Sequence, residues 1–550
     1  MDSYEKSKIF TKRYKKLKQL LKMIYGYDSF RPKQYEIINR IIHGEDVCAV
    51  LSTGAGKSIC FQIPALYLDK PAVIVSPLIS LMDDQQRILQ ELGISTCCYN
   101  SNVPNKSQMR NQIMQCKYKF IYITPESLVM SYMQDFLVEL EELHGISLIA
   151  IDEAHCISSY GFDFRKSYRE ITFFKDILPQ VPILAVTATA TDIVSKDICK
   201  VLNFKKTRII KSSFDRPNLY LEIRQKSKNI GNDIVPIIQQ YNNKSIIIYC
   251  LTKKETSKIA EILKMHKIKC GTYHAGMDTD DKTNAYRDFI SGKVKVIAAT
   301  IAFGMGINKS NVRVVIHYGS PKNIEGYYQE IGRAGRDGKK SYCYTFYNFR
   351  DFKVQEHFIE CGNNNIVYQK EQLKLLKIMK NFTTSKLCRR QILLEYFGEE
   401  APDNCNFCDN CCGVHAEQES KIVTTTQNVQ KEAKMLIELV ESFKTRSFGI
   451  NMFINILRKS ANKNVTSIMR KSKFYGAGQH RSVAWWKEIC ENLVEREFLQ
   501  QVRLKSGRFP MQVLKITKKG ITWANMSGLS GLLDGLGESQ MDPMEMLTTV

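Results

Sequence analysis

Between residues 45 and 350, short apolar runs alternate with longer amphipathic stretches. The runs are rich in β-branched residues and lack polar alternation, so each can be buried on both faces. Such runs, separated by helical patterns, predict parallel sheets covered by helices. The predicted strands are Val47–Leu51, Ala72–Val75, Phe120–Ile123, Leu148–Ile151, Ile183–Val186, Ile246–Tyr249, Val294–Ala298 and Val312–His317.

A polar break at Ser212–Pro217 divides this region into two α/β halves of similar size. We therefore expect two parallel-sheet lobes, one over residues 26–211 and one over residues 212–350. Residues 1–25 alternate Lys or Arg with Leu and Ile at helical spacing, which predicts a basic amphipathic helix. We interpret it as a solvated lead-in helix without a targeting role.

The pattern changes after residue 350. Cysteines gather in the second half of residues 351–415. We expect these residues to form a separate small helical subdomain. Three helical patterns and two strand-like runs then predict an α+β winged-helix domain over residues 425–522. These elements are Lys431–Ser442, Ile450–Arg458, Ser482–Glu497 and a hairpin within Phe498–Ile516. Residues 523–550 are rich in Gly, Met and acidic residues, and we expect a disordered tail there.

Composition narrows the class of partner. The 550 residues include 79 Lys plus Arg against 56 Asp plus Glu, a formal charge of +23. This excess favours a polyanion, with nucleic acid ahead of a membrane surface. No apolar run reaches the roughly 20 residues of a membrane span, and the Lys-rich start lacks a signal peptide. We expect a soluble intracellular protein, nuclear if eukaryotic and otherwise cytoplasmic. The 17 cysteines, mostly single in apolar runs, indicate reduced thiols.

A glycine-rich segment follows the first predicted strand. Its glycines let backbone N–H groups converge on phosphate oxygens, Lys57 supplies charge and Ser58 can ligate Mg²⁺. Leu51 stands where a strict phosphate loop has its first glycine, so an ordinary glycine-rich turn is the alternative. ATP and Mg²⁺ are the predicted ligands. The candidate nucleotide-binding residues here are Thr53, Gly54, Ala55, Gly56, Lys57 and Ser58.

Two further segments would complete a nucleotide site. Asp152 and Glu153 end a predicted strand, where Asp152 can hold Mg²⁺ through water and Glu153 can polarise the attacking water. An acidic turn without a role is the alternative. Upstream, Tyr27 offers an aromatic face and Gln34 an amide for adenine, with Arg31 in the same box. The alternative, if these residues are taken alone, is that they form a packed aromatic side chain and a helix cap without any contact to a nucleotide.

The second half carries Arg333 and Arg336 within the Gly-containing string Tyr327–Gly338 and has no phosphate loop of its own. An arginine that reaches across a cleft between the lobes would stabilise charge on the γ-phosphate in the transition state. It would do so only when the lobes are closed, so hydrolysis would be tied to closure. A surface Arg–Gly turn would be the better interpretation without the first lobe.

The clustered cysteines have the spacing of a zinc site. CxxC spacing lets two thiolates approach one Zn²⁺ at tetrahedral angles, and four sulfurs close the site against water. We therefore predict a structural Zn²⁺. The ligands are Cys388, Cys405, Cys408 and Cys411. Cys412 could replace Cys411, which leaves the fourth ligand open, and free thiols are the alternative.

In this order the motifs resemble those of superfamily 2 DEAH-box helicases and, in detail, the RecQ family, from about Tyr25 to about Lys519. The matching parts are Tyr27, Phe30–Gln34, the phosphate loop, Ser76–Met82, Thr124–Glu126, Asp152–His155, Thr187–Ala190, Phe214–Leu219, Tyr273–Met277, Ala302–Ile307, the arginine string and the Cys388–Arg390 start of the zinc site. The resemblance implies two RecA-like lobes. It implies Mg²⁺-ATP hydrolysis coupled to 3′ to 5′ movement on single-stranded DNA and unwinding of duplex DNA in repair, recombination or replication. It also implies that Tyr27 and Gln34 contact adenine and that Arg336 is the arginine finger, with Arg333 beside it.

The family carries an aromatic-rich loop after the DEAH box, matched here by Cys156–Arg165. Bases stack on aromatic faces at roughly 1–3 kcal/mol each, so the loop can bind nucleic acid. Its candidate residues are Tyr160, Phe162, Phe164 and Arg165. Tyr160 stands where the family usually has Trp and Phe162 where it usually has His, which alters hydrogen bonding. A buried aromatic cluster is the alternative.

In the winged helix, Phe509 lies beside a basic wing tip and would stack on the terminal base pair. A plain hydrophobic wing residue fits that position equally well.

Two other functions stay open. Phosphate contacts and stacking do not distinguish DNA from RNA, so the chain could be an ATP-dependent RNA helicase or translocase. The combination of a zinc site and a winged helix favours single-stranded and duplex DNA over RNA as the partner. We expect no membrane partner. The second is a catalytically inactive nucleic-acid-binding scaffold, against which the presence of Lys57, Asp152, Glu153 and Arg336 counts.

Overall fold

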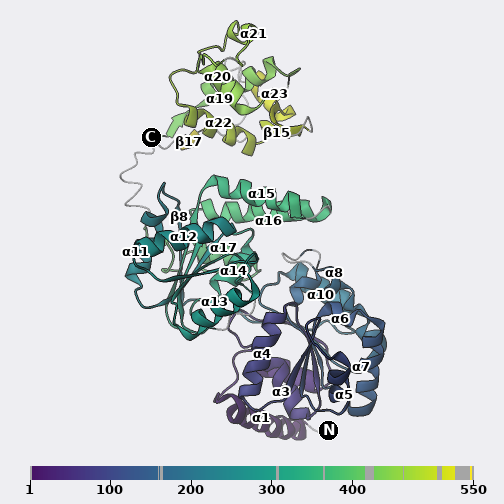
Figure 1. Cartoon of the computed structure of the whole chain (residues 1–550). Coiled ribbons are helices and arrows are strands. Elements are labelled where there is room, and N and C mark those ends of the chain that lie inside the picture. The colour runs from purple at the N-terminus through teal and green to yellow at the C-terminus, as the bar shows by residue number, and fades with distance from the viewer. Residues whose placement is uncertain are drawn as a thin grey trace. The chain divides into compact units, whose positions relative to one another are not determined.

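The chain divides into two compact units, Met1–Val414 and His415–Val550 (Figure 1). The structure is a computed structural model that describes residues 3–158, 160, 165–304, 309–362, 366–414, 426–446, 448–462, 464–504, 511–526 and 545–547. Within these ranges no helix is both long enough and apolar enough to cross a bilayer.

The first lobe is built on a seven-stranded parallel sheet of order β3-β4-β2-β5-β6-β1-β7. Val73 and Val75 face one core, whereas Ala72 and Ile74 face the core on the other side. Helices α3 and α4 cover one face, and α6 and α7 cover the other (Figure 1). Burial on both faces explains why these strands have unbroken apolar sequences. The strands are β1 (Val47–Val50), β2 (Ala72–Val75), β3 (Thr96–Tyr99), β4 (Phe120–Ile123), β5 (Ile149–Ile151), β6 (Ile183–Thr187) and β7 (Ile209–Lys211).

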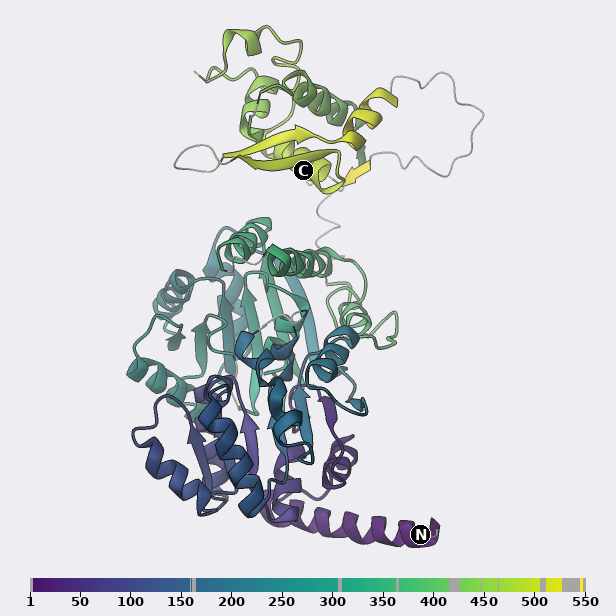
Figure 2. The same cartoon turned by 90° about the vertical axis from the view of Figure 1, so that its right-hand side faces the viewer.

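The helices of this lobe are α2 (Gln34–Ile42), α3 (Ile59–Leu68), α4 (Ile79–Glu91), α5 (Lys106–Met114), α6 (Pro125–Leu128), α7 (Ser131–His144), α8 (Lys166–Arg169), α9 (Phe174–Ile177) and α10 (Asp192–Val201). The basic helix α1 (Ser3–Tyr25) lies at the base of the lobe (Figure 2). Its Leu17 and Leu21 are buried against Ile38, Ile59 and Ile63 of α2 and α3. The helix is therefore docked on the lobe, which corrects our interpretation of it as a merely solvated lead-in.

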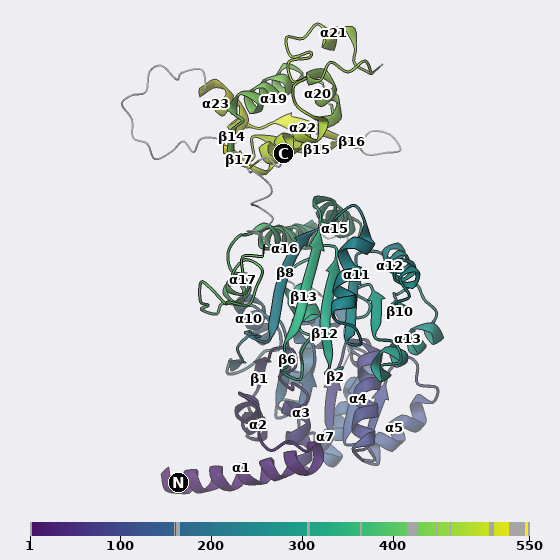
Figure 3. The same ribbon diagram turned by 90° about the vertical axis from the view of Figure 1, so that its left-hand side faces the viewer.

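The second lobe holds a six-stranded parallel sheet of order β10-β11-β9-β12-β13-β8. Strands β12, β13 and β8 lie side by side at one edge (Figure 3). Helices α11 and α12 pack on one face, and α13 and α14 on the other. The elements are β8 (Leu219–Gln225), α11 (Ile230–Gln240), β9 (Ser245–Cys250), α12 (Lys253–Met265), β10 (Cys270–Tyr273), α13 (Thr279–Ser291), β11 (Val296–Ala299), β12 (Val312–Tyr318), α14 (Ile324–Ile331) and β13 (Ser341–Tyr347).

Each strand predicted from the sequence of the two lobes is present, with ends that differ by up to two residues. The strands that the sequence did not reveal are β3, β7, β8, β10 and β13. These strands are short or carry polar residues among aromatic ones, as in β13, Ser-Tyr-Cys-Tyr-Thr-Phe-Tyr. Their pairing in the sheet stabilises them where the local pattern is weak.

The cysteine-containing subdomain follows the second lobe without a break in packing. This zinc-binding subdomain consists of α15 (Phe349–Gly362), α16 (Ile366–Thr384), α17 (Arg389–Tyr396) and the cysteine loop, residues 405–412. Cys408 forms a parallel bridge with Leu221 of β8, so the cysteine loop adds to the edge of the second sheet. The subdomain and the second lobe therefore share one core.

The second unit has the three helices and hairpin of a winged helix, as predicted. These elements are α19 (Gln430–Ser442), α20 (Ile450–Leu457), α22 (Val483–Glu495) and the antiparallel pair β15 (Leu499–Leu504) and β16 (Met511–Ile516). The sequence did not reveal α21 (Ser467–Arg470), α23 (Lys518–Met526), β14 (Thr426–Asn428) or β17 (Glu545–Leu547). The expected tail begins inside α23, and β17 within it pairs with β14, so residues 523–550 are not wholly without structure.

Trp486 belongs to the hydrophobic core of the second unit. It is fully buried, and its Nε1–H donates to the Gly478 carbonyl at 2.9 Å. We expect Trp486→Ala to lower the free energy of unfolding of this unit by about 3–5 kcal/mol because it leaves a large cavity. Trp485→Ala, at a half-buried neighbour, is the control and should cost less. Scanning calorimetry measures both, and equal effects would contradict this account.

Candidate functional site

The loop between β1 and α3 has the backbone of a phosphate cradle. Gly54 and Gly56 adopt φ angles of 87° and 81°, a region that L-residues with a side chain rarely enter. At Gly56 a Cβ would lie 2.5 Å from the side-chain nitrogen of Gln34. Both glycines are therefore required by the geometry. The loop leads from the carboxyl end of β1, an interior strand, into a helix, the position where parallel sheets bind phosphates.

Gln34 supports this loop from α2. Its amide nitrogen donates to the carbonyls of Ala55 and Gly56, at 3.0 Å each. Its amide oxygen accepts from the Arg31 N–H at 2.8 Å, and the Arg31 guanidinium donates to the Gly54 carbonyl. Both N–H groups of the Gln34 amide are thus engaged. A hydrogen bond donated to adenine would require one of them to exchange partner.

Tyr27 precedes Gln34 in the sequence, and its side chain is 55% exposed. It stacks on the Tyr25 ring with an interplanar angle of 8° and a centroid separation of 6.5 Å. The exposed ring can accept a flat aromatic ligand, as the sequence predicts for adenine.

Two carboxylates follow β5 at the same edge of the sheet. The Glu153 N–H donates to Asp152 Oδ1 at 3.0 Å, and the Tyr168 hydroxyl donates to the Asp152 carbonyl at 3.0 Å. His155 Nδ1 lies 3.3 Å from a Glu153 carboxylate oxygen and 2.9 Å from the Thr187 hydroxyl. Loss of solvent, and then the neighbouring Glu153 charge, raise the pKa of Asp152. A bound cation would offset both effects.

The arginine string of the second lobe lies directly against the phosphate loop. A Cβ added at Gly332 would be 2.8 Å from the Thr53 Cβ, and one added at Gly54 would be 3.6 Å from the Arg336 Cγ. Loss of solvent, and then the charge of Arg333, lower the pKa of Arg336 to about 10. Arg336 therefore keeps its charge at neutral pH. The structure brings together the two motifs that the sequence separates by nearly 300 residues.

Positive charge accumulates where these elements meet. Loss of solvent lowers the pKa of the Lys57 ammonium. The two carboxylates after β5 oppose that change, whereas the guanidiniums of Arg333 and Arg336 reinforce it. This cluster of cations fits a polyphosphate, which would replace their lost solvent. The oxygens of Ser58 and Asp152 are ligands that suit Mg²⁺.

The cysteine cluster fits a tetrahedral metal. Four Sγ atoms lie within 4.8 Å of one another, those of Cys388, Cys405, Cys408 and Cys411. The Sγ atoms of Cys405 and Cys411 are 3.9 Å apart, close to the separation of about 3.8 Å that tetrahedral Zn–S bonds give. The exposed Cys412 thiol donates instead to the Asn406 carbonyl at 3.7 Å. The geometry thus selects Cys411 over Cys412.

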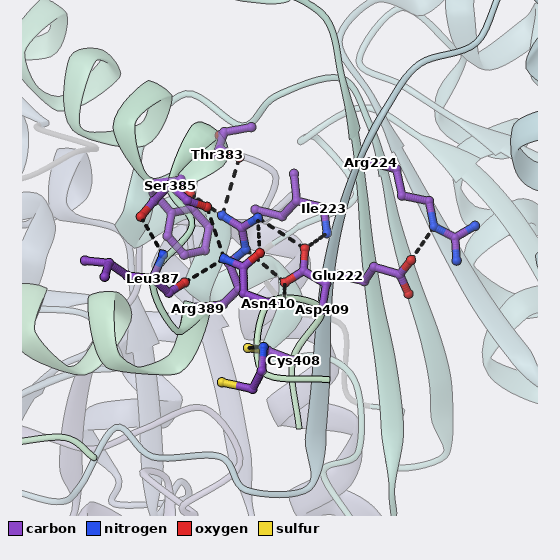
Figure 4. Close-up of polar contacts among 12 residues, drawn as sticks. Glu222, Ile223, Arg224, Thr383, Ser385, Leu387, Arg389, Cys408, Asp409 and Asn410 are labelled. Carbon is purple, nitrogen blue, oxygen red and sulfur yellow. Dashed lines mark hydrogen bonds and ion pairs between the residues drawn. The ribbon is translucent and has the colours of Figure 1, made fainter. Parts of the chain in front are cut away.

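A buried ion pair joins the cysteine loop to α17, and the same aspartate bonds to β8 of the second lobe (Figure 4). Arg389 Nε donates to Asp409 Oδ1 at 3.0 Å, and Nη2 donates to Oδ2 at 3.2 Å. The Ile223 N–H of β8 also donates to Asp409 Oδ2, at 2.9 Å. Arg389 and Asp409 are 4% and 0% exposed, so the hydrogen bonds replace the lost solvent.

The predicted nucleic-acid-binding residues are described only in part. Tyr160 is 53% exposed, and Arg165 Nη1 donates to the Pro77 carbonyl at 2.8 Å. The Arg165 bond ties the end of the aromatic-rich loop to the segment after β2. Phe162, Phe164 and Phe509 lie outside the described residues.

Arg216 is a site residue to which sequence reasoning assigned no role. Its Nη1 donates to the Thr53 carbonyl of the phosphate loop at 2.9 Å. Its Nη2 donates to the carbonyls of Ala334 and Gly335 at 2.9 and 3.0 Å. The available signal was its place in the matching segment Phe214–Leu219, which does not reveal those partners.

Four known protein families match successive parts of the chain. Residues 31–197 match the DEAD/DEAH box helicase family and residues 229–338 the helicase conserved C-terminal domain. Residues 349–412 match the RecQ zinc-binding family, and residues 424–527 match the RQC domain.

Several curated proteins are similar to the chain. It is 66% identical, over 100% of both chains, to a protein of Acanthamoeba polyphaga mimivirus with the provisional name of an ATP-dependent RNA helicase. It is 37% identical to the ATP-dependent DNA helicase RecQ of Bacillus subtilis, over 91% of this chain and 82% of that protein. It is 36% identical to the bifunctional 3′-5′ exonuclease/ATP-dependent helicase WRN of Mus musculus, over 92% of this chain and 36% of that protein.

Solved structures share the fold of the two lobes. S. cerevisiae Dbp5 bound to RNA and ADP BeF3 aligns with a TM-score of 0.50 and 20% identity, over 66% of this chain and 99% of that one. Mss116p bound to single-stranded RNA and AMP-PNP aligns with a TM-score of 0.51 and 19% identity, over 69% and 88%. The likeness shows two RecA-like lobes.

Replacement of Cys411 should remove the metal, whereas replacement of its neighbour should not. We expect Cys411→Ala to abolish zinc binding because three thiolates leave the tetrahedral site open. Cys412→Ala is the matched control and should retain one zinc per chain. Metal analysis of the purified proteins distinguishes them. Loss of zinc from the Cys412 variant alone would reverse the assignment.

Arg336→Lys should slow ATP hydrolysis by at least about 100-fold, because an ammonium cannot reproduce the fork of a guanidinium facing a phosphoryl group. The steady-state kcat for ATP is the measurement. The exposed Arg350 gives the control variant Arg350→Lys, which should keep the kcat of the unmodified protein. An unchanged kcat in Arg336→Lys would remove Arg336 from the site.

Proposed function

Because the chain belongs to the RecQ family of helicases, we propose that it couples ATP hydrolysis to 3′ to 5′ movement along single-stranded DNA. By this movement it separates duplex DNA in repair, recombination or replication. It is an ATP-dependent helicase with Mg²⁺ at its nucleotide site and a structural Zn²⁺. The four family matches together span most of the chain between residues 31 and 527, and they support a complete motor with its accessory domains.

The contact between the phosphate loop and the arginine string is the observation that carries the proposal. Backbone N–H groups of the loop and Lys57 bind the phosphates. Glu153 orients the attacking water and accepts its proton. Arg336 stabilises the charge that develops on the γ-phosphate, with Arg333 beside it. Because the two arginines belong to the other lobe, the site is complete only when both lobes meet.

Ser58 and Asp152 would hold Mg²⁺, which would neutralise part of the phosphate charge. Tyr27 stacks on the adenine. Gln34 then both binds adenine and supports the phosphate loop, because its amide nitrogen already donates to two carbonyls of the loop. An adenine that takes one of those hydrogen bonds would alter the loop, so base recognition and phosphate binding are linked through one side chain.

Two observations favour DNA over RNA as the polynucleotide. The chain matches the RecQ zinc-binding family and the RQC domain, and the RecQ relatives carry the name of DNA helicases. Unwinding of RNA is the second candidate, favoured by the provisional name of the relative that is 66% identical. Tyr160 and Arg165 would bind the strand in either case, because stacking is tolerant of the sugar.

A steady-state ATPase assay with each polynucleotide decides between these functions. We expect single-stranded DNA to raise kcat by about 10-fold or more over single-stranded RNA, and Lys57→Ala to abolish hydrolysis with either. A duplex with a 3′ tail should be unwound and one with a 5′ tail should not. Stimulation by RNA alone would support the second candidate. Absence of stimulation by both would contradict the motor.

A further inference from the structure

The segment that joins the two lobes, Ser212–Asn218, is held by the zinc-binding subdomain. We call it the interlobe linker. The Phe214 ring stacks on Phe397, which follows α17, with a centroid separation of 4.2 Å and an interplanar angle of 5°. The Glu399 carboxylate accepts from the Phe214 N–H at 2.6 Å and from the Ser213 hydroxyl at 2.8 Å. The first half of the linker is thus fixed on the turn that follows α17.

An ion pair fixes the next residue of the linker. Arg390 of α17 is largely buried; its Nη1 donates to Asp215 Oδ1 at 2.6 Å and its Nη2 to the Leu219 carbonyl at 2.9 Å. The Tyr328 hydroxyl of α14 donates to the Phe214 carbonyl at 2.7 Å. The linker is therefore clamped from α17 and from the second lobe. Charge-assisted bonds of this kind are stronger than neutral ones and fix direction.

Arg216 follows the clamped residues and extends into the nucleotide site. One guanidinium donates to a carbonyl of the first lobe, Thr53, and to two of the second, Ala334 and Gly335. Asn218 supports the same turn, since its amide nitrogen donates to the Gly335 carbonyl at 2.9 Å. The three acceptors of Arg216 can be reached together only when the phosphate loop and the arginine string are adjacent.

We propose that Arg216 is a positioning residue that holds the phosphate loop against the arginine string, and that the zinc-binding subdomain sets its position through the interlobe linker. The proposal rests on the nucleotide site assigned under Proposed function. Arg216 acts through backbone carbonyls and contributes to closure of the lobes. Lysine cannot replace it because a single ammonium lacks the planar fork that serves acceptors on both sides. The zinc-binding subdomain thereby takes part in ATP hydrolysis as well as in stability.

The first test changes the guanidinium. Arg216→Lys and Arg216→Ala should lower the DNA-stimulated kcat by about 10-fold or more, with the KM for ATP within about 3-fold, as expected for an interaction made only at closure. Zinc content and the melting temperature should stay those of the unmodified protein. Arg224→Ala, on the following strand, is the matched control and should leave kcat unchanged. An unaltered kcat in both Arg216 variants, or a rise in KM alone, would overturn the proposal.

The second test concerns the clamp. Asp215→Asn keeps the shape of the side chain and weakens its pair with Arg390, so it should lower kcat by several-fold at normal zinc content. The same change in the Arg216→Ala background should have little further effect, because the two residues act in series. Independent, multiplicative effects would refute the link. If the unmodified protein hydrolyses ATP and Lys57→Ala does not, such a failure concerns Arg216 alone and leaves the proposed function intact.

Discussion

The nucleotide site depends on positive charges that two lobes bring together. Lys57 comes from one lobe, Arg333 and Arg336 from the other, and all three have lost solvent in a shared space. Their mutual repulsion opposes closure, and the carboxylates of Asp152 and Glu153 offset only part of it. A triphosphate provides the remaining negative charge and makes closure favourable. Hydrolysis and release remove part of the negative charge, so the electrostatic balance of the cleft changes with each catalytic cycle.

Parallel sheets make this arrangement possible. The phosphate loop and the two carboxylates follow β1 and β5, whose carboxyl ends share one edge of the first sheet. The second lobe repeats the architecture without a phosphate loop and contributes arginines instead. The interlobe linker, Arg216 and the zinc-binding subdomain form a continuous series of contacts that ends at the phosphate loop. The zinc site, which is remote in sequence from the nucleotide site, is therefore connected to the nucleotide site through these contacts.

Much of the fold follows from local patterns, and the remainder depends on pairing. Val47–Val50 and Ile149–Ile151 are apolar on both faces, so the sequence alone identifies them as interior strands. In β13 the run Tyr342–Tyr344 lies between Ser341 and Thr345, and only the neighbouring strands reveal the place of this strand.

The same limit applies to the site. Glycine, lysine and carboxylate spacing identifies the phosphate loop and the DEAH box. It cannot distinguish Cys411 from Cys412, or reveal that Arg216 spans both lobes, because these choices depend on side-chain direction. The cysteine loop has one more effect, at the edge of the second sheet. Asp409 caps the Leu221 carbonyl and the Ile223 N–H of β8. Open strand edges recruit other strands and lead to aggregation. A newly made chain whose cysteine loop has not yet folded onto β8 therefore exposes this strand edge to other chains. Zinc binding orders the loop and completes the coverage of the edge.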